Sequence, residues 1–502
     1  MTAGNPPIAG GRPGTESPPP QQLFRGTAAL VAAALIQRSL GLLLLPLFTR
    51  VLSPAEYGQI GVIASVTAAI PTVLGFGLDT ALLRGYVRSG GDGTASRVLI
   101  NTVGGFAIVL PLSVCGLGIV LLAPSATFMG VSTEAMALAL AGAAATTAAT
   151  AMPLALFRAQ GRFADYFRLT ATQVVLTTGM AVFFVAVLRW GVTGWVLAGA
   201  AGSFLVLALG LGMLRHRWTW EFDPRALAQA LAFGLPLVPH ALAHWGLSVS
   251  DRTLLGAFVS DVEIGHYYVA YQACVPVTVL AIAISRATQP TFAAAAESSV
   301  SRGQLARTST FQVLLVSLTA ASVALLGPPL IRLVLPPSYA PAADFLPWLS
   351  IGSALFGLYL IPMNSIAVMT GRTGRVWIIT ALAASLNVGL NLVLIPRIGA
   401  QGAAINTAVG YLALLTGVTM YMRRVSDPPI PFEYLRLTIG TSLILAVGLV
   451  ATLFTPPEPA MALAVRLAAI AAVIVVLVRA LFYREASNIY QMVRSRAGGI
   501  IR

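Results

Sequence analysis

The chain has 502 residues, of which 57% are hydrophobic and only 10% are charged, whereas charged residues make up about a quarter of a typical soluble domain. This composition predicts a membrane protein. The formal net charge is +14, from 31 basic and 17 acidic residues, and every one of the 31 is an arginine.

Residues 1–22 are rich in Pro and Gly, and they lack the charged start and cleavage site of a secretory signal. They predict a disordered cytoplasmic tail. Cys115 and Cys274 lie in apolar runs, so neither a disulfide framework nor a thiolate metal site is indicated.

Long apolar runs follow the tail and predict about fourteen transmembrane helices. The runs cover about residues 26–49, 59–83, 98–122, 134–157, 168–188, 192–214, 227–249, 264–288, 308–331, 344–368, 377–396, 401–422, 437–454 and 461–481. Such long runs exclude a closed barrel, because helices satisfy their own backbone hydrogen bonds in lipid. The short connections leave no room for a soluble catalytic domain, so we do not expect an enzyme.

The arginines predict how these helices are oriented, because short cytoplasmic loops are enriched in positive charge. The two tails and every second loop hold 23 arginines, and the opposite loops hold five. This asymmetry predicts an even number of spans with both termini in the cytoplasm.

Three short motifs recur in the same order with nearly one offset, which indicates an internal repeat. The pairs are Ser53–Gly58 with Ser260–Gly265 (offset 207), Arg189–Gly194 with Arg397–Gly402 (offset 208), and Gly161–Arg162 with Gly371–Arg372 (offset 210). Six helices separate the copies, so the two halves are expected to share one orientation about an axis along the membrane normal.

This repeat predicts an all-α protein with two parallel six-helix lobes. We expect an N-lobe over 23–217, a C-lobe over 218–425, two further helices over 426–482 and a cytoplasmic tail over 483–502. Two such lobes form a V-shaped cleft that opens alternately to either side, which is typical of a transporter.

Ionisable side chains inside the membrane cost from about 3 to above 10 kcal/mol, so they usually face a partner or a polar cavity. Arg38 lies near the midplane of the first span, between Gln37 and Ser39. Its donors suit phosphate oxygens, so we expect it to face the substrate; the alternative is pairing with a neighbouring helix. Arg286, in the eighth span, either faces the same cavity or extends to the membrane surface.

Asp79, in the second span, lies about one turn before Arg84. It is either a local ion-pair partner or a group that binds a proton or cation. Arg466, in the last span and close to the outer surface, is expected to extend to that surface.

The seventh span contains Pro236 and Pro239, which free backbone carbonyls and predict a kink that acts as a hinge. His240 and His244 share a face of this helix. No third ligand is evident, so we predict polar packing, with His240 a candidate for the cavity wall, and no metal site.

Asn387 and Asn391 share one face of the eleventh span. They either line the cleft or form hydrogen bonds to another helix.

Several motifs resemble the polysaccharide-biosynthesis membrane proteins, which are oligosaccharide flippases of the multidrug/oligosaccharidyl-lipid/polysaccharide (MOP) exporter superfamily. They are Pro46–Gly58, Phe233–Pro236 leading to Ser250–Arg252, and Glu263–Tyr267. The resemblance covers about residues 23–425. It implies a V-shaped bundle of two lobes in a bacterial inner membrane, which moves an undecaprenyl-pyrophosphate-linked sugar to the outer leaflet by alternating access.

The resemblance extends to the lipid II flippases, which carry an arginine element in the first span that Arg38–Gly41 matches. Their cavity arginine in the eighth span corresponds to Arg286, so both arginines are implied to bind pyrophosphate. Leu44 stands where those proteins have a second arginine, which favours a different glycolipid. In some relatives, helices 13 and 14 help to form a groove for the lipid tail.

We therefore predict an exporter for cell-surface polysaccharide biosynthesis. Its expected partners are the lipid-linked oligosaccharide, membrane lipids and a complex with a polymerase or glycosyltransferase, with no nucleic acid. We expect no cofactor. Transport is expected to be coupled to the membrane potential, H⁺ or Na⁺. The alternative is a multidrug/cation antiporter of the same superfamily, which a cationic midplane disfavours. A glycan polymerase would need an outer loop longer than residues 250–263.

Overall fold

The computed structural model describes most of the chain. The described residues are 40–89, 93–215, 221–426, 442, 446, 465–468 and 470–471. Both predicted tails, much of the first predicted span and most of the last two therefore lie outside the described residues.

Ten helical stretches in the described part of the chain are long and apolar enough to cross a membrane. They are Pro54–Arg88, Ser96–Leu122, Thr133–Ala159, Phe163–Val187, Gly191–Leu214, Pro224–Ser248, Asp261–Ala296, Ser301–Val334, Pro337–Thr370 and Thr373–Val425. They confirm the prediction of an all-helical, multi-pass membrane protein. The last stretch contains predicted spans 11 and 12, separated by a kink at Ile398 and Gly399.

The first half contains nearly continuous helices and one short hairpin. Its elements are α2 (Leu45–Val51), α3 (Pro54–Leu74), α4 (Leu78–Arg88), α5 (Thr94–Leu122), β1 (Thr127–Phe128), β2 (Val131–Ser132), α6 (Thr133–Ala149), the π-helix η1 (Thr150–Leu154), α7 (Ala155–Ala159), α8 (Phe163–Ala181), the π-helix η2 (Val182–Val187) and α9 (Gly191–Leu214). The strands β1 and β2 pair antiparallel.

The second half begins with a broken helix. Its elements are α10 (Pro224–Gly234), the 3-10 turn η4 (Leu235–Leu237), α11 (Val238–Ser248), α12 (Ser250–Phe258), α13 (Asp261–Ala273), α14 (Val275–Glu297), α15 (Ser299–Val334), the 3-10 helix η5 (Pro337–Phe345), α16 (Leu346–Asn364), the π-helix η6 (Ser365–Thr370), η7 (Thr373–Arg375) and α17 (Val376–Val425).

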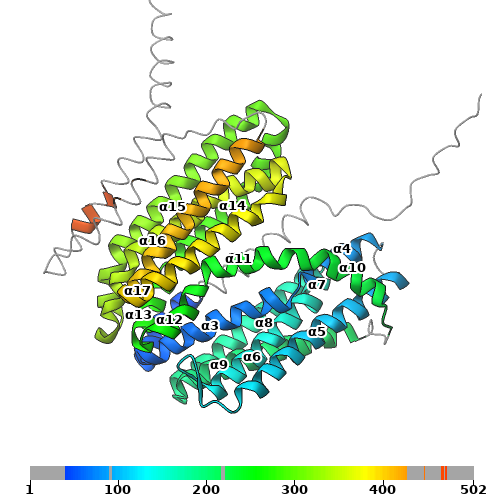
Figure 1. Cartoon of the computed structure of the whole chain (residues 1–502), viewed down its shortest axis with the longest axis horizontal. Helices are drawn as coiled ribbons and strands as arrows, with labels where there is room; N and C mark the ends of the chain where they lie inside the picture. Colours follow the sequence, from blue (N-terminus) through cyan, green and yellow to red (C-terminus); the bar gives the residue numbers. More distant parts are fainter. Residues whose placement is uncertain are drawn as a thin grey trace, which may run out of the picture.

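The helices gather into two groups, α3 to α9 and α14 to α17, with α11 between them (Figure 1). The groups meet at α12 and α13, because α13 packs along α3. We call this end, which includes the β1–β2 hairpin, the hairpin end. Away from this joint each group has its own far end, formed by α4, α7 and α10 in the first group and by the α14–α15 turn, η7 and the end of α17 in the second; we call these two far ends together the arginine end.

The arginine end takes its name from its helix ends and loops. The described arginines there are Arg84, Arg88, Arg97, Arg158, Arg162, Arg168, Arg215, Arg225, Arg302, Arg307, Arg372, Arg375, Arg423 and Arg424. The hairpin end has Arg50, Arg189, Arg252, Arg332 and Arg397. The described residues thus show the same charge asymmetry on which the predicted orientation depends.

The first pair of recurring motifs meets at the hairpin end. Ser53 caps α3 in a capping box with Glu56, and the Ser260 hydroxyl caps α13 by accepting from the N–H of Glu263, without the reciprocal bond of a capping box. A Cβ at Gly58 would collide with the carbonyl oxygen of Asp261, and a Cβ at Gly265 would collide with that of Pro54. These four positions are related by the offset of 207, so the contact is reciprocal, as between two copies about a twofold axis.

The second pair of motifs touches the acids of the first. Gly191 and Gly399 both have positive φ, +56° and +61°, and a Cβ at either would crowd the carboxylate of Glu56 or Glu263, respectively. The N–H of Ala400 also donates to Glu263 Oε1 at 2.6 Å. Glycine is required at both places by conformation and by space.

Candidate functional site

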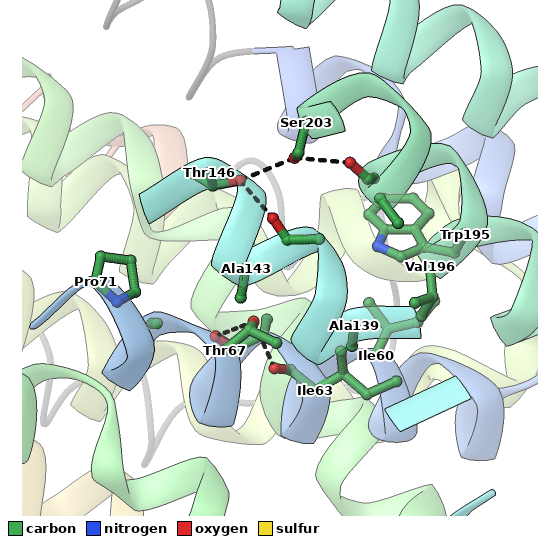
Figure 2. A pocket seen from close by; sticks show the side chains of 15 residues that line it. Ile60, Ile63, Thr67, Pro71, Ala139, Ala143, Thr146, Trp195, Val196 and Ser203 are labelled. Atoms are coloured by element: carbon green, nitrogen blue, oxygen red, sulfur yellow. Dashed lines mark hydrogen bonds between the residues drawn. The ribbon is translucent and has the colours of Figure 1, made fainter. Parts of the chain in front are cut away.

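A cavity of about 380 Å³ lies inside the first half, between α3, α6 and α9 (Figure 2). Three hydroxyl side chains from different helices make part of its wall polar: Thr67, Thr146 and Ser203. Thr146 Oγ1 lies 2.8 Å from Ser203 Oγ, so this pair joins α6 to α9 across the cavity. The remaining lining residues are Ile60, Ile63, Ala64, Ala68, Pro71, Ala139, Gly142, Ala143, Trp195, Val196, Gly199 and Ala200.

A second cavity of about 260 Å³ adjoins the first and shares Trp195, Gly199 and Ser203 with it. Its other lining residues are Leu40, Gly41, Leu44, Phe48, Gln173, Val174, Thr177, Thr178 and Ala181. The ring of Phe48 meets Trp195 edge to face, with centroids 4.8 Å apart. Both cavities are thus built from the first half alone, and neither is lined by a charged side chain in the described residues.

These uncharged cavity residues are not among the residues predicted from the sequence, because ionisable side chains are the more conspicuous candidates in a membrane span. A signal was nevertheless present. Gln173 and Thr177 are four residues apart, as are Gly199 and Ser203, so each pair shares a helix face. Polar and small residues repeated on one face of a transmembrane helix indicate either helix contacts or a cavity.

The predicted diphosphate site begins with Gln37, Arg38 and Ser39, which lie outside the described residues. The described chain starts at Leu40, and Leu40 and Gly41 line the second cavity. The segment that follows the predicted substrate arginine is therefore part of a cavity wall.

Arg286 is exposed on α14, and within the described residues it has no hydrogen-bond or ion-pair partner. Its neighbour Ser285 is buried and accepts a hydrogen bond from Asn364 Nδ2 at 2.8 Å. The backbone beside Arg286 is thus fixed to α16, while the guanidinium is available to an anion.

Asp79 forms an ion pair with Arg158 of α7 at 3.2 Å, and both side chains are about a third exposed. The prediction that Asp79 pairs locally with Arg84 was wrong. The guanidinium of Arg84 instead lies over the ring of Phe233, 4.5 Å from the centroid. The pairing differs because α7 packs against α4 and brings a residue distant in sequence to the carboxylate.

The seventh span is broken where its prolines lie. Pro236 is in the 3-10 turn η4, and Pro239 is in the first turn of α11, where a missing N–H costs little. On one side of the break α10 packs on α4 and α5, and on the other α11 packs on α17. A Cβ at Gly234 would collide with the carbonyl oxygen of Phe76, which has a positive φ of +46°.

The two histidines of α11 differ in environment. His240 is half-buried and its Nδ1 has no partner, whereas His244 is exposed with its ring 6.5 Å from that of Phe356. No group of three or more metal-ligating side chains occurs in the described part of the chain.

Asn387 and Asn391 are buried, and Asn387 forms the hydrogen bonds to another helical segment that the second alternative expected. Asn387 Nδ2 donates to the carbonyl oxygen of Asn406 at 3.2 Å, and Asn406 Nδ2 donates to that of Asn387 at 2.6 Å. Asn391 Nδ2 adds a bond to Asn387 Oδ1 at 3.3 Å. These residues join the two parts of α17 on either side of its kink.

A buried ion pair lies at the hairpin end. Asp251 and Arg252 are 6% and 4% exposed, and their side chains are 3.2 Å apart. Tyr267 donates to Asp251, and the guanidinium lies 3.8 Å from the Tyr271 ring centroid. Burial lowers the pKa of Arg252, but Asp251 and the tyrosines outweigh it, so the net pKa is raised and the cation persists. The motif Ser250–Arg252 contributed to the resemblance without a stated role.

Known proteins are similar to this one over most of the chain. A family model described as "Polysaccharide biosynthesis protein" matches residues 47–344, more than half of the chain. None of the curated proteins matches the sequence.

Among solved structures, the lipid II flippase MurJ in an inward closed conformation is similar, with a TM-score of 0.67 and 12% identity over 91% of this chain and 99% of that one. An inward-facing multidrug resistance MATE family transporter of the MOP superfamily has a TM-score of 0.61 and 15% identity, covering 81% and 96%. An outward-facing one has a TM-score of 0.54 and 15% identity, covering 84% and 96%. These identities show a shared fold.

Proposed function

The chain belongs to the polysaccharide biosynthesis protein family, and we propose that this membrane transporter moves an undecaprenyl-pyrophosphate-linked oligosaccharide across the bacterial plasma membrane for cell-surface polysaccharide biosynthesis. Both termini would lie in the cytoplasm, which puts the arginine end on the cytoplasmic side. The substrate would enter there and leave at the hairpin end.

The observation that carries the proposal is the balance of charge among the candidate cavity and membrane residues. Neither cavity is lined by a carboxylate in the described residues, and Asp79 is neutralised by Arg158. Arg286 has no acidic partner in the described chain. This balance favours an anion such as a diphosphate over a cation as the substrate.

In this mechanism Arg38 and Arg286 grip the diphosphate, because a guanidinium offers several donors to phosphate oxygens. Gln37 and Ser39 keep the surroundings of Arg38 polar. The broken helix α10–α11 crosses between the two groups and bends near Pro236 and Pro239 as the lobes rock. Asp79 is a candidate for coupling to H⁺ or Na⁺, with the membrane potential as the other energy source.

The test is translocation of a polyprenyl-diphosphate oligosaccharide in proteoliposomes that contain the full-length protein. We expect Arg38→Ala and Arg286→Ala each to reduce the rate about tenfold or more, because a charge-assisted hydrogen bond is lost. Arg286→Lys would retain part of the rate. Arg424→Ala, at an exposed helix end, is the matched control and should transport normally.

Wild-type rates in both alanine variants, with normal protein levels, would show that the arginines do not bind the substrate.

A second candidate function is multidrug/cation antiport, which the shared fold with MATE transporters favours. The lack of a lining carboxylate in the described cavities argues against it. Expression in a drug-sensitive host separates the two: protection against cationic drugs would support antiport, and we expect none.

A further inference from the structure

We propose that the two adjoining cavities of the first half bind a neutral sugar residue of the transported glycan. This inference rests on the proposed function and deepens it, because it assigns the part of the substrate beyond the diphosphate to a particular place. The cavities have four features that suit a sugar: hydrogen-bonding groups, an aromatic face, a sufficient volume and a lining without charge.

The second cavity is lined by polar groups that the described protein does not satisfy. Gln173, Thr177 and Thr178 on α8 are half-buried, and none has a hydrogen-bond partner among the described residues. The indole N–H of Trp195 likewise has none in this part of the chain. Because polar groups at membrane depth are normally paired, four such side chains around one space indicate a polar occupant.

The first cavity contributes acceptors. The hydroxyl of Thr67 donates to the carbonyl oxygen of Ile63 at 2.7 Å, and that of Ser203 donates to the carbonyl oxygen of Gly199 at 2.8 Å (Figure 2). Each hydroxyl has therefore used its proton. Thr67 keeps its lone pairs for a ligand, whereas Ser203, which also accepts from Thr146 Oγ1, keeps one. Donors on α8 and α9 and acceptors on α3 and α9 together match sugar hydroxyls, which both donate and accept.

Trp195 supplies the aromatic face, since it lines both cavities. Its edge-to-face contact with Phe48, at 79° between the ring planes, holds the indole in place. An indole combines a flat apolar surface with an N–H at one edge, which suits a ring that has C–H groups on its faces and hydroxyls at its rim. The larger cavity, about 380 Å³, is within the range of roughly 300–1,000 Å³ for small-molecule sites.

The lining selects against charge. A uronic acid would need a cationic partner and a cationic drug an anionic one, and the lining residues named above include neither. The position also fits the substrate. Leu40 and Gly41 line the second cavity and follow Arg38 by two and three residues in the sequence, so the proposed sugar site begins close in the chain to the proposed diphosphate ligand.

The test compares three probes on the full-length protein in nanodiscs: bare polyprenyl diphosphate, the same lipid carrying one neutral hexose, and the same lipid carrying one uronic acid. We expect the neutral glycolipid to bind at least about tenfold more tightly than the other two. Gln173→Leu and Thr177→Val should each reduce this preference about 5- to 10-fold, since each removes hydrogen bonds to the sugar.

Two further variants guard against a trivial loss of folding. Trp195→Phe keeps an aromatic ring and removes only the indole N–H, so it should reduce the preference less than Gln173→Leu. Thr170→Val is the matched control, because the Thr170 hydroxyl is on the same helix, bonds to the carbonyl oxygen of Tyr166 at 2.9 Å and lies outside both cavities. It should leave the preference unchanged.

The outcomes are distinguishable without any variant. Equal wild-type affinity for all three lipids would overturn the sugar subsite while leaving diphosphate binding intact. Equal affinity for the neutral and acidic glycolipids would overturn its neutrality. If no lipid binds, the proposed function fails and the subsite fails with it.

Discussion

The two ends of the helix bundle are held together in different ways. At the hairpin end the halves touch through backbone atoms at Gly58 and Gly265, and the Tyr339 hydroxyl donates to the carbonyl oxygen of Leu52 at 2.8 Å. At the arginine end, the first helix of the second half, α10, packs instead on α4 and α5 of the first half. After the break at η4 the chain packs mainly on α17 of its own half, and α11 also keeps a contact with α3.

This difference separates stability from transport. A contact made by backbone atoms at van der Waals distance tolerates no added side chain, so the hairpin end should determine whether the protein folds. A helix that changes partners at a break should determine how the lobes move. Four substitutions test this division.

The largest expected effect is from Asp251→Ala at the hairpin end. It leaves Arg252 charged and buried without its carboxylate, and removing one partner of such a pair costs about 3–5 kcal/mol. Thermal unfolding of the purified protein measures the loss. The double variant Asp251→Leu/Arg252→Met should be less unstable than Asp251→Ala, and an equal or greater loss would show that packing matters more than the unpaired charge.

Gly265→Ala should destabilise the protein by up to about 3 kcal/mol, because the new Cβ collides with the carbonyl oxygen of Pro54 and α13 must move away from α3. The same thermal unfolding measures it. Gly389→Ala is the control, since a Cβ at Gly389 meets nothing within 4 Å. Similar unfolding temperatures for the two variants would contradict a tight joint at the hairpin end.

Gly234→Ala should reduce the transport rate about tenfold while the protein still folds. The Cβ collides with the carbonyl oxygen of Phe76, so the break can no longer hold its present geometry. Gly246→Ala, in the same span, is the control because its Cβ would lie 3.7 Å from the Ala384 Cβ. Transport assays in proteoliposomes compare the two variants. A normal rate in Gly234→Ala would contradict a hinge at this break.

Asp79→Asn should have the smallest effect on stability, below about 1 kcal/mol, because the Asp79–Arg158 pair is about a third exposed. The informative effect of Asp79→Asn is on transport. If Asp79 couples export to a cation, the variant should lose dependence on the cation gradient. Transport that responds to the gradient as in the wild type would exclude that coupling.

The helices themselves were largely predictable, because a membrane span requires a long apolar run that is visible in one window of sequence. The recurring motifs were visible as well. Their contact was not, since no local pattern states that Gly58 meets Asp261 and Gly265 meets Pro54. The reciprocal contact explains why motifs with glycine and a capping serine occur at both places.

The candidate site was less predictable. Arg286 was selected because a charge in a membrane span is conspicuous. Gln173, Thr177 and Trp195 were overlooked because polar uncharged and aromatic residues in a span usually pack between helices. Only the arrangement of residues 40–48, α3, α6, α8 and α9 around a common space separates the two interpretations.

Composition and spacing by themselves determined that this chain is a polytopic helical membrane protein, and they placed its excess of arginine on one side, because hydropathy and charge act on each segment separately. The tertiary structure decided that Asp79 pairs with Arg158, that Asn387 joins two helices and that the first half contains a cavity without charge. These features depend on side chains from helices distant in sequence, and their geometry exists only once the helices pack.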